Sequence, residues 1–123
     1  PFTEYSSIYY LKDKYNLIDS GTFWLSETPD VMSKGWGAAH YRIASYVILK
    51  DKATGEDFVV FNTHLDHRGK EAQKNGLALI VSRIDDINPK GYPMVLTGDF
   101  NIKPNKSVVF NAPNCLSFSC FGN

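Results

Sequence analysis

The residues FVVFNTHLDH at positions 58–67 begin as an apolar run and end in polar side chains, and MVLTGDFN at positions 94–101 has the same order. Apolar residues at consecutive positions are typical of a central strand that is covered on both faces. Between the two stretches, apolar residues recur at helical spacing from Glu71 to Ile87, and Pro89 ends the pattern. Strand, helix and strand form a crossover unit, which predicts two parallel strands lying side by side.

Upstream residues predict further strands. Tyr41–Leu49 and Phe58–Thr63, joined through Thr54 and Gly55, are expected to form an antiparallel hairpin. Short runs at Ile8–Leu11 and at Tyr15–Leu25 predict two more strands next to each other. Between these strands and the hairpin, residues 26–39 contain the glycine, proline and serine of a long surface loop, which is where we expect a wall of the substrate site.

The composition limits the kinds of function. The chain has 123 residues, 43% of them hydrophobic, and 13 basic residues balance 13 acidic ones, which indicates a globular domain or part of one, without a polybasic nucleic-acid tail. No apolar run approaches the roughly 18 residues of a membrane helix, so we expect no membrane partner. Cys115 and Cys120 lack the spacing of a zinc site and are interpreted as free thiols or a local bridge. The localisation cannot be inferred from the sequence.

The polar residues that follow the two apolar strands are the main functional signal. The carboxyl ends of parallel neighbouring strands meet at one edge of a sheet, so His64 and Asp99 are expected to share a crevice. Asp99 can orient or deprotonate a water, His64 can hydrogen-bond a phosphoryl oxygen, and the amide of Asn101 can donate to a developing oxyanion. Gly98 is expected to let a ligand or ion approach the backbone. Together these groups suit hydrolysis of a phosphoester.

Asn62-Thr63-His64-Leu65 followed by Gly98-Asp99-Phe100-Asn101 resembles the motif pair of the endonuclease/exonuclease/phosphatase superfamily. The stretch from Gly21 to Asp30, with Arg42 downstream, is similar to compact bacterial members of that superfamily. The resemblance extends from about Glu4 to about Pro104. It implies an α/β (α+β) sandwich, as a partial four-layer fold with a mixed, mostly antiparallel sheet and one main helix.

The resemblance also implies roles for individual residues in a Mg²⁺-dependent, or Mn²⁺-dependent, phosphoester hydrolase. Asp99 would position the attacking water and bind the metal, and Asn101 would bind the phosphate. His64 would contact the scissile phosphate, and Glu4 would orient that histidine. Arg42 would contact the phosphate from the neighbouring strand.

Two further residues are expected to contact substrate, Asn62 through its place in the motif and Trp36 by stacking on a substrate ring. The substrate itself, a nucleic acid or a small phosphorylated molecule, stays open, although zero net charge argues against a tight duplex-DNA binder.

Each residue also has a structural interpretation. Asp99 and Asn101 could form a tight turn, His64 could be a core histidine, and Asp66 and His67 could cap the helix that follows them. Arg42 could be a surface cation. His40 is interpreted as loop surface and Trp24 as core.

The superfamily's metal-binding Glu and its closing Ser-Asp-His motif have no counterpart in this chain, which we therefore interpret as a single, truncated domain over residues 1–123 with little activity of its own. The alternative is a non-catalytic remnant or interaction module that retains the middle of the fold. Either way, a sheet face left bare would favour a homodimer.

Overall fold

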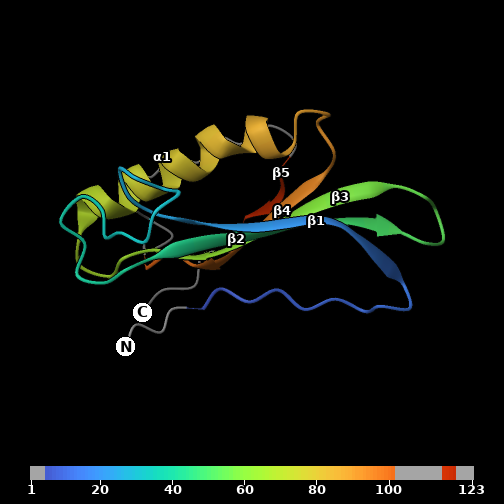
Figure 1. Cartoon of the computed structure of the whole chain (residues 1–123), viewed down its shortest axis with the longest axis horizontal. Coiled ribbons are helices and arrows are strands. Elements are labelled where there is room, and N and C mark those ends of the chain that lie inside the picture. The colour runs from blue at the N-terminus through green and yellow to red at the C-terminus, as the bar shows by residue number, and fades with distance from the viewer. Residues whose placement is uncertain (1–4, 102–114, 119–123) are drawn as a thin grey trace.

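A computed structural model describes residues 5–101 and 115–118 of the chain. The elements follow one another as β1 (Tyr15–Trp24), β2 (Ile43–Asp51), β3 (Asp57–His64), α1 (Lys70–Ile87), β4 (Met94–Asp99) and β5 (Cys115–Phe118). They form one layer of strands with α1 lying along one face (Figure 1). The predicted α/β class, with a mixed sheet and one main helix, is confirmed for the described residues. The sheet is not mostly antiparallel, however, because two of its four strand pairings are parallel.

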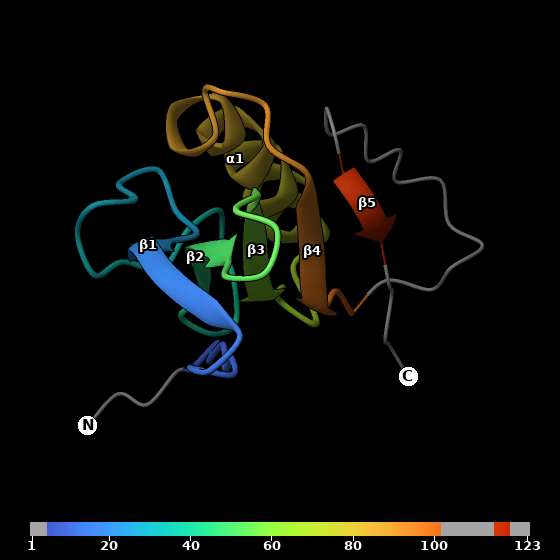
Figure 2. The ribbon, with the colours of Figure 1, turned by 90° about the vertical axis from the view of Figure 1, so that its right-hand side faces the viewer.

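The five strands lie in the order β1-β2-β3-β4-β5, which Figure 2 shows from one edge of the sheet to the other. β1 with β2 and β2 with β3 are antiparallel, whereas β3 with β4 and β4 with β5 are parallel. The predicted hairpin and the predicted crossover through α1 are therefore both confirmed, and β3 is the central strand. β5 lies in a part of the chain for which the sequence predicted no strand, and Cys120 lies outside the described residues.

α1 and the sheet enclose the main core. The buried side chains on the helix are Ala72, Leu77, Ile80 and Ile84, at the predicted spacing, together with Gly76. They pack over alternate residues of β3 and β4, among them Val59, Phe61 and Leu96, which are fully buried. Burying a large aliphatic or aromatic side chain contributes about 1.5–3 kcal/mol, so this one cluster accounts for the position of α1.

The predicted strand at Ile8–Leu11 is wrong. Residues 5–11 have no strand partner and run past the sheet on the side away from α1 (Figure 1), where the Ser7 carbonyl accepts a hydrogen bond of 3.0 Å from the Asn62 amide. Tyr9 and Leu11 are exposed in this segment. Aromatic and β-branched composition signals a strand only where a sheet edge is available to pair with it.

The face of the sheet away from α1 is neither bare nor fully covered. Val47 and Leu49, which alternate with the core-facing residues of β2, are nevertheless buried. On β3 and β4 the corresponding residues Val60 and Val95 are only half-buried. The prediction of a bare face is wrong. The prediction that β3 is covered on both faces is confirmed in part, because one face is buried and the other is half-buried. A homodimer through this face stays a prediction.

No helix among the described residues has the length and the apolar character needed to cross a membrane.

Candidate active site

The candidate site lies where β3 and β4 end side by side. Their parallel register places His64 opposite Asp99 and Thr63 opposite Gly98. The ladder continues one residue further, since the Leu65 amide donates a 2.9 Å hydrogen bond to the Asp99 carbonyl. The predicted meeting of the two polar clusters at one sheet edge is therefore what the fold produces.

His64 and Asp99 face each other across the strand tips. His64 Nε2 lies 3.6 Å from Asp99 Oδ2, and the two side chains are 37% and 46% exposed. The separation is too long for a strong hydrogen bond, so neither group is locked to the other. Both are reachable from solvent, which rules out the core-histidine interpretation of His64 and leaves the pair able to contact a ligand.

Asn101 fixes the chain directly after β4. Its backbone N–H donates to Asp99 Oδ1 at 3.0 Å, and its side-chain amide donates to the Leu65 carbonyl at 2.8 Å. The residue has a φ of 49°, in the left-handed region that asparagine tolerates better than most residues. The turn interpretation of Asn101 therefore describes its backbone, and its predicted phosphate contact stays a prediction.

At Gly98 the backbone of β3 leaves no room for a side chain on β4. The φ of Gly98 is 147°, and a Cβ on it would stand 1.9 Å from the Thr63 carbonyl oxygen. The expectation that this glycine makes room for a ligand or ion is wrong, because the backbone of β3 occupies that space. The glycine serves the site indirectly by letting β3 and β4 bring His64 and Asp99 together.

Arg42, just before β2, is buried rather than a surface cation. Its Nη1 lies 3.0 Å from His64 Nδ1, its Nη2 lies 3.5 Å from His67 Nδ1, and its Nε lies 3.8 Å from Asp66 Oδ1. A permanent positive charge thus stands directly beside the strand tip that carries His64, although its predicted contact with phosphate is untested.

Asp66 organises the loops around the site, a role that the helix-cap interpretation missed. The carboxylate is buried and accepts backbone N–H bonds from Ala39, His40, Arg68 and Gly69 at 2.7–3.2 Å. Burial alone raises the pKa of this carboxyl, but the four N–H donors together hold its pKa below the ordinary value. Asp66 therefore ties the loop before Arg42 to the segment that leads into α1.

Gln73 is a second connection that the sequence did not reveal. From the first turn of α1 its side-chain amide donates to the Asp66 carbonyl at 2.6 Å and to the Asn101 carbonyl at 3.2 Å. One side chain thereby holds the segments after β3 and after β4 at a fixed separation. A lone Gln in a helix gives no sequence signal of such a role, because the two acceptors are brought together only by the fold.

The replacement Asp66→Asn is expected to destabilise the chain by about 2 kcal/mol at neutral pH, because one of its two oxygens becomes an amide that faces N–H donors. A carboxyl with a lowered folded-state pKa contributes stability above its unfolded pKa of about 3.9, and that stability is lost as the pH falls through the folded value. The difference between wild type and Asp66→Asn, measured by urea unfolding, should therefore shrink below about pH 4.

Asp57 provides a control for the Asp66 prediction. Its pKa is also lowered, mainly by the hydrogen bond from Lys50 at 2.8 Å, but this pair lies nearer the surface. About 1 M salt screens a surface ion pair, so it should reduce the contribution of Asp57 to the pH dependence of the free energy of unfolding. The contribution of Asp66 should stay the same in salt, because its carboxylate is buried. An Asp66 contribution equally sensitive to salt would contradict the proposed backbone origin of the shift.

The remaining predicted site residues lie in different parts of the chain and differ in their contacts. Asn62 lies on the same face of β3 as His64, where its amide donates to Ser7 and its Oδ1 accepts from the Thr97 hydroxyl at 3.1 Å. Trp36 is half-buried with a φ of 51°, and among residues 5–101 no hydrogen bond or ring contact joins its side chain to the strand tips. Glu4 lies outside the described residues. Trp24, predicted as core, is half-buried against the Tyr41 ring.

His40 is exposed, as predicted for a loop residue, but it is not isolated. Its ring stacks on that of His67, with the centroids 5.1 Å apart and the planes 25° from parallel. All three histidines of the chain therefore contact Arg42 or one another beside the strand tips.

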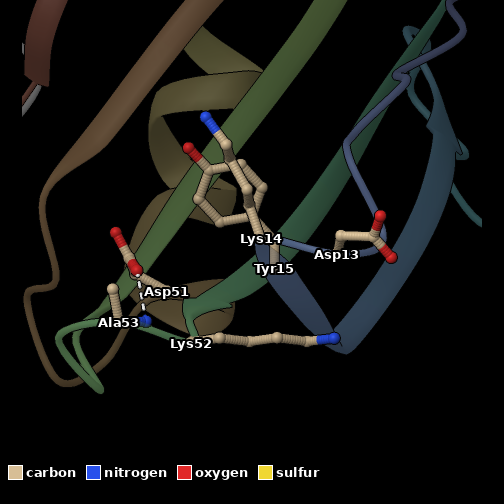
Figure 3. A pocket seen from close by; sticks show the side chains of 6 residues that line it. All are labelled: Asp13, Lys14, Tyr15, Asp51, Lys52 and Ala53. Carbon is tan, nitrogen blue, oxygen red and sulfur yellow. Dashed lines mark hydrogen bonds between the residues drawn. The ribbon is translucent and has the colours of Figure 1, made fainter.

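A separate hollow lies at the other end of the sheet (Figure 3). It is an open cavity of about 530 Å³ lined by Asp13, Lys14, Tyr15, Asp51, Lys52 and Ala53. Acidic and basic groups alternate around it, and Asp51 Oδ1 already accepts the Ala53 N–H at 2.8 Å. It has no contact with His64 or Asp99 and adds nothing to the candidate site.

Asp99 is the residue of the strand tips that we predicted to bind the metal. Asp99 offers a partly exposed carboxylate, but among the described residues no three His, Cys, Asp or Glu side chains gather as a metal site. Mg²⁺ is often held by one or two carboxylates together with substrate phosphates. Asp99 fits such an ion only in company with substrate oxygens or further ligands.

Comparisons with known proteins give one consistent result. The chain is 48% identical to an endonuclease/exonuclease/phosphatase from Bacteroides vulgatus, with a TM-score of 0.74 over 78% of this chain and 37% of that one. It is 43% identical to a mannosyl-6-phosphatase from Bacteroides thetaiotaomicron, with a TM-score of 0.76 over 80% of this chain and 37% of that one. The chain thus spans little more than a third of these structures.

Two further comparisons give no description of a function. An uncharacterised protein of Acanthamoeba polyphaga mimivirus is 31% identical over 81 residues, which are 63% of this chain and 30% of that protein. No family model matches the chain.

Proposed function

Since this chain carries part of the endonuclease/exonuclease/phosphatase fold and is 43–48% identical to solved members of that superfamily, we propose that the full-length protein hydrolyses a phosphoester at the tips of β3 and β4. The full-length protein is here the chain extended to the length of those relatives. One observation carries the proposal, namely the 3.6 Å separation of His64 Nε2 and Asp99 Oδ2 at strand ends that stand in parallel register.

In the proposed reaction, Asp99 orients the attacking water and accepts its proton as the water oxygen bonds to phosphorus. The ester P–O bond breaks in the same displacement, and the leaving alcohol oxygen takes a proton from solvent. Oδ1 of Asp99 is held by the Asn101 N–H, which leaves Oδ2 toward His64 and solvent. His64 donates from Nε2 to a phosphoryl oxygen, because its Nδ1 faces the Arg42 guanidinium, which is only a donor. The charge of Arg42 close to His64 favours the additional negative charge that develops on phosphoryl oxygens in the transition state.

The proposed metal is Mg²⁺ or Mn²⁺, held by Asp99 together with ligands that the full-length protein and the substrate supply. When bound, such an ion neutralises charge on the phosphoryl oxygens and orients the attacking and leaving groups.

A small phosphorylated molecule is the substrate class that we favour. The chain has zero net charge, whereas a protein that binds duplex DNA tightly neutralises several phosphates with Lys and Arg. One of the relatives, at 43% identity, is described as a mannosyl-6-phosphatase, which makes a sugar phosphomonoester the first substrate to test.

The chain of 123 residues on its own is expected to turn over phosphoesters at least about 100-fold more slowly than the full-length protein, because removing groups that stabilise transition-state charge costs factors of this size. The measurement is release of inorganic phosphate from mannose 6-phosphate, and of nitrophenol from a nitrophenyl phosphodiester, with and without Mg²⁺. Full activity of the short chain would contradict the expectation that the site needs further residues. Absence of activity in the full-length protein on every phosphoester tested would contradict the proposed function.

A further inference from the structure

Arg42 sits between two imidazoles. Its Nη1 lies 3.0 Å from Nδ1 of His64, and its Nη2 lies 3.5 Å from Nδ1 of His67. The buried Asp66 carboxylate lies 3.8 Å from Nε of the same guanidinium, within ion-pair distance. The fork of Arg42 is therefore directed at the same ring atom of both histidines.

This arrangement determines where each imidazole carries its proton. A guanidinium has five N–H donors and no acceptor, so an imidazole nitrogen that faces it has to be the unprotonated one. In a neutral imidazole the proton then resides on the other nitrogen. For both His64 and His67 that nitrogen is Nε2, which the ring geometry directs away from Arg42.

We propose that Arg42 is a positioning residue that fixes His64 and His67 as Nε2–H tautomers, and that His67 is a second phosphoryl-binding donor beside His64. The assignment of His67 rests on the proposed function, whereas the assignment of Arg42 does not. The first candidate role of Arg42, contact with the phosphate, concerns its charge; the role proposed here concerns the direction of two hydrogen-bond donors.

His67 has the properties of a held donor. It follows Asp66, whose carboxylate is fixed by four backbone N–H groups, and its ring is stacked on His40 at 5.1 Å. The residue is nevertheless exposed, so its Nε2 is accessible to a ligand. An imidazole that only capped α1 would not require the contacts with Arg42 and with the His40 ring. The N-cap position of α1 is occupied by Gly69, and no side chain hydrogen-bonds there.

The tautomers can be measured directly in the chain of 123 residues, because it holds only three histidines. Long-range ¹H–¹⁵N spectra at about pH 8, where a free imidazole is neutral, separate protonated from unprotonated ring nitrogens. We expect both His64 and His67 to be Nε2–H tautomers.

Arg42→Lys should abolish this preference in at least one of them, since a single ammonium cannot replace the two-pronged guanidinium. Arg83→Lys, at an arginine that pairs with Asp30 instead, is the matched control. An Nδ1–H tautomer of His67 in the wild type would overturn the role of Arg42, whether or not the variants fold.

Titration with inorganic phosphate tests the role of His67. The Nε2 signals of His64 and His67 should shift together. His67→Gln, which keeps an N–H donor near the place of Nε2, should bind phosphate at least about threefold more tightly than His67→Asn, which does not reach it, and the Asn variant should lose about tenfold relative to wild type. A shift of His64 alone would overturn the assignment of His67 and leave the proposed function intact. No shift of either ring would overturn the assignment of His67, and if the rings of the full-length protein also fail to shift, the result counts against the proposed function as well.

Discussion

Asp99→Asn is expected to lower phosphoester hydrolysis by the full-length protein about 10³-fold. General-base catalysis contributes roughly 10²–10⁴-fold, and an amide can neither accept the proton of water nor act as an anionic metal ligand. Asp99 Oδ1 accepts a hydrogen bond from the Asn101 N–H, and the side-chain oxygen of an asparagine at position 99 can accept the same bond. The loss should therefore appear in kcat, with the folded structure retained. The measurement is steady-state kinetics with Mg²⁺ on mannose 6-phosphate, together with a thermal unfolding curve of each protein.

The matched control for Asp99→Asn is Asp30→Asn. Asp30 is also an exposed carboxylate close to a side-chain nitrogen, 3.2 Å from Nη2 of Arg83, but it lies outside the candidate site. We expect this variant to hydrolyse at the wild-type rate. An Asp99→Asn protein that keeps more than a tenth of the wild-type rate would exclude Asp99 as the general base.

Gly98→Ala is expected to destabilise the chain by about 2–6 kcal/mol, the sum of backbone strain and overpacking. Its φ of 147° is one that side-chain-bearing residues rarely adopt, and its Cβ would lie 1.9 Å from the Thr63 carbonyl oxygen, in the backbone of β3. The strands cannot separate there without breaking the parallel pairing that places His64 opposite Asp99. Domains are stable by only about 5–15 kcal/mol, so the substitution should remove a large share of the free energy of unfolding.

Gly55→Ala measures the cost of backbone strain at a positive φ without a steric clash of the added Cβ. Gly55 has a φ of 75°, and a Cβ there would meet nothing within 4 Å, so the change should cost only about 1–2 kcal/mol. Urea unfolding followed by circular dichroism measures both variants. If Gly98→Ala is no less stable than Gly55→Ala, the close contact of β3 and β4 at Gly98 does not carry the energy that we assign to it.

The sequence was sufficient for the elements whose signal is local. The consecutive apolar residues of Phe58–Phe61 and the helical spacing of Glu71–Ile87 identified β3 and α1, because burial on a strand or helix imposes those patterns directly. The parallel pairing of β3 with β4 also followed from the sequence, since a helix between two strands nearly always produces a crossover.

The sequence was insufficient where a role depends on distant neighbours. Ile8–Leu11 has strand composition but no partner strand, and only the fold reveals that it crosses a sheet face. The contacts of Arg42 with His64 and His67 join residues more than 20 positions apart, and those of Asp66 with Ala39 span 27. No spacing rule encodes such contacts, so the buried arginine and the loop-organising carboxylate could be recognised only in three dimensions.

The central claim is that His64 and Asp99 act on one phosphoryl group. The most direct test is the hydrolysis rate of the full-length protein carrying His64→Gln, Asp99→Asn, or both. Groups that act together lose their contribution as a unit, so the double variant should be much less impaired than the product of the two single effects predicts. Single effects that multiply fully in the double variant, or a His64→Gln protein with the wild-type rate, would contradict a shared site at the tips of β3 and β4.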